Sequence, residues 1–387
     1  MIYLDNSATT KQDPAVTECM ISCMQETYGN PSSLHRMGLE AEKLLKQARR
    51  QLKEAAGRTE DRVIFTSGGT EADNMVIFGA AKAGRRRGNR IVTTAVEHPA
   101  VLEPMRSLED AGFEVIRVGV DRQCMLDLEA LEDAIDGQTI LVRVMQVNNE
   151  TGTIQPVEEA AEIIRRKQSP ALLHCDAVQS FGKIPLPAAA DMISISGHKI
   201  HGPKGSGALL MDRSLHLPAY LQGGGQEEGL RSGTENVPAI AGLGVAAQIA
   251  GEGRSERMER IARMRERLWT GLSEEIPDTV LNSPRQAGEK TSLCVGSVLN
   301  VSFPGTRGEV ILHTLEQYGI CVSTGSACSS NTKGRSHVLQ AMGLKEQEIE
   351  GAIRFSLSGF NTMEEIEEAV EKTAEAVKRF RRLGSFR

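Results

Sequence analysis

The sequence predicts an α/β fold, with a large domain built on a mainly parallel sheet and a smaller α+β domain. Three observations support this prediction. The chain has 387 residues, enough for one large domain and a smaller one, and strand patterns alternate with helix patterns from residue 60 to 215. A second group of strand and helix patterns follows residue 298. Such alternation is typical of parallel sheets, because parallel neighbours need a long crossover connection.

In the large domain the helix at 39–57 comes first, where apolar residues recur every three or four positions. Two more helices, at 99–112 and 128–137, lie between strands and end in glycine. A helical stretch at 238–273 follows a run of glycines and leads toward the rest of the chain. The strands are short apolar runs rich in β-branched residues, at 63–67, 90–95, 113–118, 139–147, 171–176, 192–196 and 207–211.

The smaller unit is expected to contain strands and helices in alternation. Its predicted elements are strands 298–303, 319–323 and 352–358 and helices 308–318, 335–342 and 362–380. We expect the large domain to span residues 14–256. The small domain would combine residues 1–13 with 257–387 and carry Cys328 on a loop.

Composition and charge favour small-molecule chemistry. Hydrophobic residues make up 40% and charged residues 25%, which excludes disorder, and the net charge of −6 is unfavourable for a nucleic-acid surface. Seven cysteines without a Cys-x-x-Cys pair support neither a disulfide framework nor a zinc ribbon. With no predicted signal peptide, membrane span or metal site, we expect a cytoplasmic protein with reduced thiols.

Lys199 is the first candidate catalytic residue. It lies in SISGHKIHGPKGSG (194–207), where a buried-looking strand gives way to a glycine-rich loop. In an α/β sheet that position borders the ligand crevice, and a lysine there can serve as an imine-forming amine. A solvated surface lysine is the alternative.

Other strand ends carry matching groups. Strand 63–67 runs into Gly69 and Thr70, which predicts a phosphate cradle at a helix N-terminus; the alternative is a plain turn with Thr70 as the N-cap. Asp176 ends its strand and is suited to hold a protonated ring nitrogen, as pyridoxal 5′-phosphate (PLP) requires, or to cap a turn. His98 follows strand 90–95 at the same edge. No ATP-binding or dinucleotide-binding fingerprint is present.

Cys328 differs from the other cysteines. It opens CSSNTKGRS, a run of small and polar residues unable to pack a core, with Lys333 and Arg335 near enough to favour a thiolate. Three cysteines on or beside predicted strands are expected to be buried and inert, and three histidines are expected to be packed. These are Cys175, Cys294, Cys321, His35, His216 and His313.

The sequence resembles the cysteine desulfurases, fold-type-I PLP enzymes of the class V aminotransferase group, over almost its whole length. The segments that carry the resemblance are YLDNSATT (3–10), YGNPSSLH (28–35), TSGGTEADN (66–74), EHPAV (97–101), VNNETG (147–152), HCDAVQ (174–179), SGHKIHGPKG (196–205), GGGQEEGLRSGTEN (223–236), TGSACSS (324–330) and IRFSLS (353–358).

The resemblance implies a PLP site with defined roles. Lys199 would hold PLP as a Schiff base, and Asp176 would pair with the pyridine nitrogen. Gln179 would face the ring hydroxyl, while His98 would stack on the ring and act as an acid or base. The phosphate would be bound by Gly69, Thr70, Ser196 and His198, with Thr234 reaching it from the other subunit of a homodimer.

The resemblance also implies the substrate and the reaction. Asn149 and Arg354 would hold the carboxylate of L-cysteine, because a guanidinium can bind it through two hydrogen bonds. Cys328 would take the sulfur as a persulfide and pass it to an acceptor protein, an iron–sulfur scaffold or a tRNA-thiolation enzyme. A selenocysteine lyase, an aminotransferase on the same scaffold and a non-enzymatic sulfur-transfer scaffold are the alternatives. Aminotransferases need no such thiol, and the intact Lys199 and Asp176 argue against a scaffold.

Overall fold

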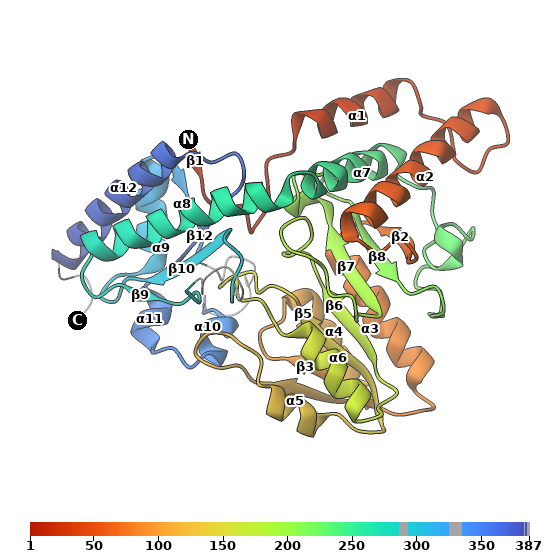
Figure 1. Ribbon diagram of the computed structural model, residues 1–387, viewed down its shortest axis with the longest axis horizontal. Helices are drawn as coiled ribbons and strands as arrows, with labels where there is room; N and C mark the ends of the chain where they lie inside the picture. Colours follow the sequence, from red (N-terminus) through yellow and green to blue (C-terminus); the bar gives the residue numbers. More distant parts are fainter. Residues whose placement is uncertain (286–292, 325–334, 383, 385–387) are drawn as a thin grey trace.

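The computed structural model of the chain describes residues 1–285, 293–324, 335–382 and 384. Figure 1 shows two parts, one built around a seven-stranded sheet and the other around a three-stranded sheet. Two helices, α7 (Val237–Gly251) and α8 (Arg254–Glu275), follow one another from the first part into the second. The fold is therefore the predicted α/β arrangement with a large and a small unit.

The large sheet is mainly parallel, as predicted. Its strands run in the order β2-β8-β7-β6-β5-β3-β4, and β8 alone among these seven runs opposite to the other six. The reason is the connection from β7 to β8, which contains a short 3-10 turn but no α-helix to cross the sheet. The bounds are β2 Arg62–Thr66, β3 Arg90–Thr94, β4 Glu114–Val118, β5 Thr139–Met145, β6 Leu172–Asp176, β7 Met192–Ser196 and β8 Gly207–Met211.

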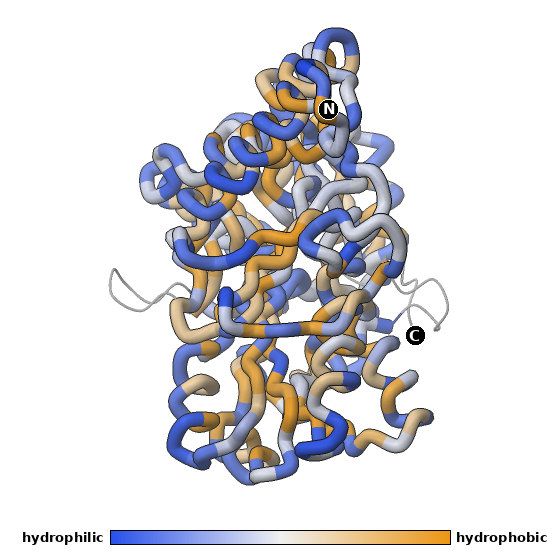
Figure 2. The backbone as a smooth tube through the Cα atoms, turned by 90° about the vertical axis from the view of Figure 1, so that its right-hand side faces the viewer, coloured by the Kyte–Doolittle hydropathy of each residue, from blue (hydrophilic) through white to orange (hydrophobic). Residues whose placement is uncertain are grey.

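Helices cover both faces of this sheet. Adjacent residues of β2 belong to different hydrophobic clusters, Ile64 with α3 and α4, and Phe65 with α2, α5, α6 and α7. This follows from the alternation of side chains along a strand. In Figure 2 hydrophobic stretches run through the interior of the molecule. The helix bounds are α1 Pro14–Gln25, α2 Arg36–Ala56, α3 Gly69–Gly84, α4 Pro99–Asp110, α5 Leu128–Ala134 and α6 Val157–Arg166.

The second part has its own core. Helices α8, α9 and α12 pack against an antiparallel sheet of order β12-β10-β9, and Ile2 and Leu4 join the same cluster. This separate core supports the predicted division at residue 256, which stays a prediction. The remaining bounds are β1 Ile2–Tyr3, β9 Val280–Leu281, β10 Val298–Ser302, α9 Gly308–Gln317, β11 Ile320–Cys321, α10 His337–Ala341, α11 Glu346–Glu350, β12 Ala352–Ser356 and α12 Met363–Arg382.

Two elements differ from the prediction. The helical stretch at 238–273 is interrupted at Glu252 and Gly253, because Gly253 takes a left-handed conformation with φ of 57°. The strand expected at 319–323 forms only as β11 and pairs with β1 rather than with the three-stranded sheet.

Candidate active site

The predicted catalytic side chains gather at the carboxyl edge of the large sheet. His98 follows β3, Asp176 ends β6, and Lys199 ends the short turn η1 (Gly197–Lys199) after β7. Because these strands are parallel, their carboxyl ends meet at one edge. Burial lowers the pKa of His98, and the nearby charges act in opposite senses, Asp176 raising it and Lys199 lowering it. The three side chains are thus close enough to share one site.

Lys199 is directed toward the first residues of the chain. Its Nζ donates hydrogen bonds to the backbone oxygens of Ser7 at 2.5 Å and Ala8 at 2.8 Å. The buried strand β7 delivers this lysine, and the turn behind it is tight. A Cβ on Gly197 would lie 2.5 Å from Ser206 Oγ, which explains the glycine there.

The N-terminus of α3 is the place where the phosphate cradle is predicted. A Cβ on Gly69 would lie 2.6 Å from Val178 Cγ2 and 3.7 Å from Ser196 Cβ, so the starts of three loops meet there. The N-cap is Gly68, not Thr70, and no described side chain caps the helix. The first N–H groups of α3 therefore remain available for an anion, and Thr70 lies exposed in the first turn.

His198 lies in the turn η1 after β7, and its role in phosphate binding stays a prediction. Its Nδ1 lies 3.1 Å from Thr9 Oγ1, and its backbone oxygen accepts hydrogen bonds from both polar groups of Thr10. Burial, and to a smaller extent Lys199, lower the pKa of His198 to about 4. The imidazole is therefore neutral near pH 7.

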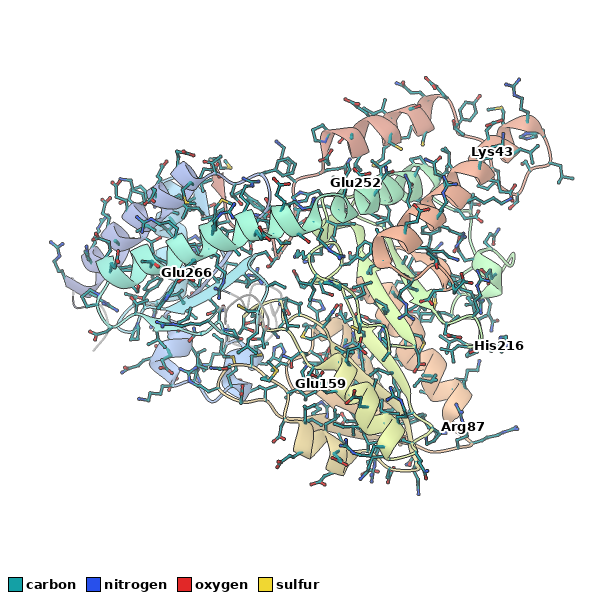
Figure 3. The ribbon with its side chains drawn as sticks, viewed as in Figure 1. Lys43, Arg87, Glu159, His216, Glu252 and Glu266 are labelled. Atoms are coloured by element: carbon teal, nitrogen blue, oxygen red, sulfur yellow. The ribbon has the colours of Figure 1, made fainter. Side chains whose placement is uncertain are left out.

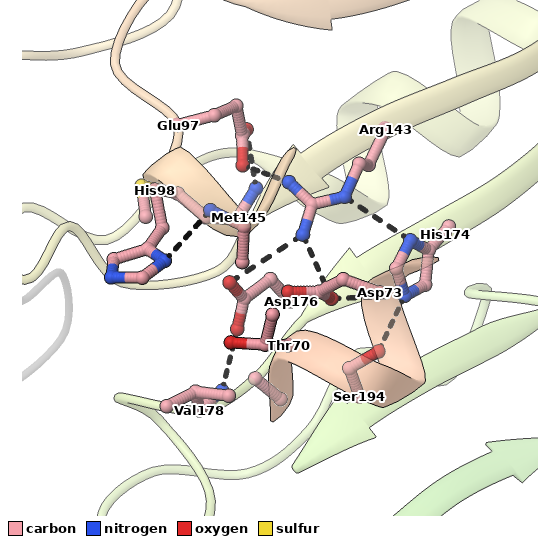
Figure 4. A network of polar contacts seen from close by, with 12 residues as sticks. Thr70, Asp73, Glu97, His98, Arg143, Met145, His174, Asp176, Val178 and Ser194 are labelled. Carbon is pink, nitrogen blue, oxygen red and sulfur yellow. Dashed lines mark hydrogen bonds and ion pairs between the residues drawn. The ribbon is translucent and has the colours of Figure 1, made fainter. Parts of the chain in front are cut away.

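Asp176 is held from two sides (Figure 4). Its Oδ1 accepts a hydrogen bond from Val178 N at 2.8 Å, which is the turn-capping use that the sequence left open. Its Oδ2 lies 3.5 Å from Nη2 of Arg143, a fully buried guanidinium. Both contacts fix a carboxylate that is only 5% exposed.

Arg143 is the centre of a buried ionic cluster that the sequence analysis missed. It forms ion pairs with Glu97 and, at 2.9 Å, with Asp73, and it donates to His174 Nδ1 at 3.2 Å. Burial raises the pKa of Asp73 to about 8 and also raises that of Glu97. Burial opposes the charge on Arg143, but the surrounding carboxylates outweigh it and raise its pKa. The available signal was a charged residue in the middle of the apolar strand 139–147.

Arg354 and Asn149, the predicted carboxylate-binding pair, are brought together. Arg354 Nη1 donates to the Asn149 backbone oxygen at 3.1 Å, and Nη2 donates to Asp5 Oδ1 at 2.8 Å. Its buried Nε has no hydrogen-bond partner among the described residues. Gln179 lies next to Lys199, since its Nε2 donates to the oxygen of Ser7, the same oxygen that Lys199 contacts. Arg354, a donor suited to bind an anion, is thus linked to Lys199 through residues 5–8.

Two predicted residues are not placed at the site. Thr234 lies exposed in the loop before α7, which Arg231 anchors to α3 through an ion pair with Glu71 at 2.8 Å. Cys328 and Lys333 lie outside the described residues. Arg335, expected to favour the thiolate, forms an ion pair with Glu346.

The predictions for the remaining cysteines and histidines hold only in part. Cys175 and Cys294 are buried as expected. Cys321 is only half-buried, because β11 is a short strand at the edge of the fold. The prediction of packed histidines is wrong, because all three lie exposed in turns or at helix surfaces: His35, His216 and His313. Figure 3 shows His216 at the outer edge of the molecule.

The donor set fits PLP. An uncapped helix N-terminus suits its phosphate, the carboxylate of Asp176 suits its ring nitrogen, and the amine of Lys199 suits its aldehyde. No group of three or more possible metal ligands occurs in the part of the chain that the structure describes. The phosphate, the ring nitrogen and the aldehyde of PLP each have a matching group at this edge.

Comparisons with known proteins agree with this arrangement. Residues 2–369 match the family model of the class-V aminotransferases. The chain is 44% identical to a cysteine desulfurase of Trichormus azollae, over 100% of this chain and 95% of that protein. It is 42% identical to the cysteine desulfurase IscS of Pectobacterium atrosepticum, over 99% and 94%.

Solved structures give the same result. A NifS-like protein matches with a TM-score of 0.90 and 39% identity, covering 98% of this chain and 99% of the other. SspA in complex with cysteine matches with a TM-score of 0.80 and 32% identity, covering 94% and 100%. Similarity of this extent spans both parts of the fold and the whole edge where the site lies: the chain belongs to the class-V aminotransferase family and is a PLP-dependent cysteine desulfurase.

Proposed function

We propose that this enzyme removes sulfur from L-cysteine, releasing L-alanine and leaving a persulfide on Cys328. The observation that carries the proposal is the connection made by residues 5–8. Asp5 pairs with Arg354, while the backbone oxygens of Ser7 and Ala8 hold Lys199. An amino acid whose carboxylate is bound by Arg354 therefore has its α-carbon on the side of Lys199.

The residues divide the chemistry among them. PLP, when bound, supplies an electron sink for the bonds at the α-carbon of an amino acid. Lys199 removes the proton from that carbon, and Asp176 holds the proton on the ring nitrogen, with Arg143 fixing the carboxylate from behind. Burial lowers the pKa of His98, so its imidazole would be suited to accept and return a proton beside the bound cofactor.

Both flanks of residues 325–334 support Cys328 as the sulfur acceptor. Ser323 and Arg354 exchange two backbone hydrogen bonds, of 3.1 and 2.7 Å. On the other flank, His337 Nε2 lies 2.9 Å from the backbone oxygen of Glu97, next to His98. The chain therefore enters and leaves the segment that contains Cys328 at the candidate active site.

The sulfur transfer balances without an added oxidant. The thiolate of Cys328 attacks the sulfur of L-cysteine, so that a sulfur–sulfur bond forms and the carbon–sulfur bond breaks. The electron pair of the broken carbon–sulfur bond stays with the substrate carbon. That carbon then takes a proton, and the product leaves as alanine. Only a thiolate is an effective nucleophile for this step.

Two substitutions test this function. Lys199→Ala is expected to lose the visible absorbance of the bound cofactor and all alanine formation. Cys328→Ser is expected to keep the absorbance but to carry no persulfide by mass spectrometry after incubation with L-cysteine. Cys19→Ser, which removes a free, partly exposed thiol on α1, is the matched control and should label normally. Undiminished alanine and sulfide release by Cys328→Ser would contradict the proposal and favour a direct lyase, such as a selenocysteine lyase.

We also propose that the enzyme is a homodimer. Large apolar side chains are exposed from the second half of α1 into α2 and again before the Thr234 loop, and such patches mark interaction surfaces. They are Ile21, Met24, Tyr28, Leu34, Met37, Leu39, Tyr220 and Leu221. A second copy covering this surface would let Thr234 complete the other subunit's phosphate site. Sedimentation should give twice the chain mass, and a PLP-loaded monomer would contradict this proposal.

The remaining partners are proposed from chemistry. A persulfide is consumed by another thiol, so an acceptor protein that builds iron–sulfur clusters or thiolates tRNA is the proposed partner. Because a reactive thiol requires reducing conditions, the cytoplasm is the proposed location. None of the helices in the described ranges has the length and apolar character needed to cross a membrane.

A further inference from the structure

Lys183 lies directly behind the site, in the turns that follow Asp176. Its Nζ donates a hydrogen bond to Gln179 Oε1 at 3.1 Å, and Gln179 Nε2 donates to the oxygen of Ser7 at 3.0 Å. Gln179 is 4% exposed, so its amide has few other partners to choose from. A chain of hydrogen bonds thus runs from Lys183 through Gln179 to the oxygen that also holds Lys199.

The chemistry of these groups determines which way the amide faces. An ammonium has three donors and no acceptor, and a neutral amine still has two donors, so the carbonyl oxygen of Gln179 is the group that Lys183 can bind in either protonation state. The opposite orientation would place two donors against each other at Lys183 and two oxygens against each other at Ser7. The orientation with the NH₂ group toward Ser7 and the site is therefore the one that both neighbours satisfy.

No ion pair among the described residues accounts for the position of Lys183. Its side chain is half-buried and forms no ion pair with a carboxylate in the described part of the chain, although taking a lysine out of water is costly without one. Burial lowers the pKa of Lys183 to about 7, and the charges of Lys199 and Arg354 act in the same direction. Either protonation state of the amine can still donate to Gln179, so the hydrogen bond survives across the neutral range.

We propose that Lys183 is a positioning residue that locks the amide of Gln179 with its NH₂ group toward the cofactor. This inference rests on the proposed role of Gln179 opposite the ring hydroxyl. An NH₂ group facing that oxygen stabilises its anionic form, whereas a carbonyl would repel it. Lys183 thereby acts on the cofactor through Gln179 without touching it.

Lys183→Met tests the proposal, because methionine keeps the length of the side chain and removes the donor. The affinity of the apoprotein for PLP should fall about tenfold, the effect expected of one lost hydrogen bond to a charged acceptor. The pH midpoint of the visible absorbance change should rise, because an amide of Gln179 that is no longer held with its NH₂ group toward the ring oxygen stops stabilising the anionic form of the bound chromophore. Lys183→Arg should stay close to wild type. Lys82→Met, an exposed lysine in the last turn of α3, is the matched control.

A double-mutant cycle separates positioning from a general effect of charge. In a Gln179→Leu background, Lys183→Met should change neither the PLP affinity nor the pH midpoint further. If Lys183→Met shifts the PLP affinity and the pH midpoint equally in both backgrounds, the role of Lys183 is refuted. It is also refuted if Gln179→Leu shifts these quantities and Lys183→Met does not; neither outcome touches the role of Gln179. No shift in Gln179→Leu itself would refute the proposed role of Gln179, and the role of Lys183 with it. The thermal midpoint of each apoprotein must match wild type or exceed it, because a loss of stability with the same loss of affinity would point to a purely structural role.

Discussion

Replacing Arg143 with methionine should destabilise the apoprotein strongly and in a pH-dependent way. Arg143 is fully buried and forms ion pairs with Asp73 at 2.9 Å, with Asp176 at 3.5 Å and with Glu97. Removing one partner of a buried ion pair costs about 3–5 kcal/mol, because the other charge is left without compensation. Here two fully buried carboxylates lose their counter-ion together, so we expect a loss at or above the upper end of that range near pH 8.

The pH dependence follows from proton linkage. Burial already raises the pKa of Asp73 to about 8 and that of Glu97 above its usual value, and losing the guanidinium raises both further. The unfolded chains titrate alike, so the variant loses stability relative to wild type wherever its folded form keeps a proton that folded wild type has lost, from the wild-type pKa of each carboxyl, about 8 for Asp73, up to the further raised value. Its stability must fall as the pH rises through that window, by about 1.4 kcal/mol per pH unit for each proton retained.

The assay is urea unfolding of the apoprotein, which gives the free energy of unfolding at about pH 5.5 and at about pH 8.5. Arg90→Met is the matched control, since Arg90 lies in the neighbouring strand β3 and pairs with the half-exposed Glu114 and Asp136. Exposed pairs contribute at most about 1 kcal/mol, so its loss should be small and nearly independent of pH in this range. A loss in Arg143→Met that is as small as the control, or that does not grow with pH, would refute the reasoning.

Three further predictions concern single side chains. Gly69→Val should weaken PLP binding at least about tenfold in an equilibrium titration, because its Cβ would lie 2.6 Å from Val178 Cγ2 and displace the cradle. His198→Gln should make the apoprotein more resistant to acid by about 1–2 kcal/mol at pH 4–5, because the unfolded histidine binds a proton below about pH 6.5 and the folded one only near 4. Arg354→Lys should raise KM for L-cysteine about tenfold with normal cofactor absorbance, since lysine lacks the planar fork that also contacts Asn149.

Local pattern and parallel topology made most of the site predictable. Apolar runs located the strands, and the rule that parallel strands end at one edge was enough to bring His98, Asp176 and Lys199 together. The contacts of Lys199 with Ser7 and Ala8 were not predictable, because they join residues 192 and 191 positions apart through backbone oxygens that any residue carries. The partners of Arg143 were hidden because their carboxylates come from three other parts of the chain, although the arginine itself was visible in its strand.

The threading of residues 5–8 through the site sets a constraint on the order of events during synthesis. Asp5 leaves the ribosome long before its partner Arg354, which is 349 positions further along, and Ser7 waits for Lys199 over 192 positions. Contacts over such distances form late, after the local parts of the chain have folded. A nascent chain that stalls before residue 354 can complete the large sheet and still lack a finished carboxylate-binding site. The ability to process L-cysteine therefore arises only once nearly the entire chain has been made, which keeps an immature enzyme from handling reactive sulfur.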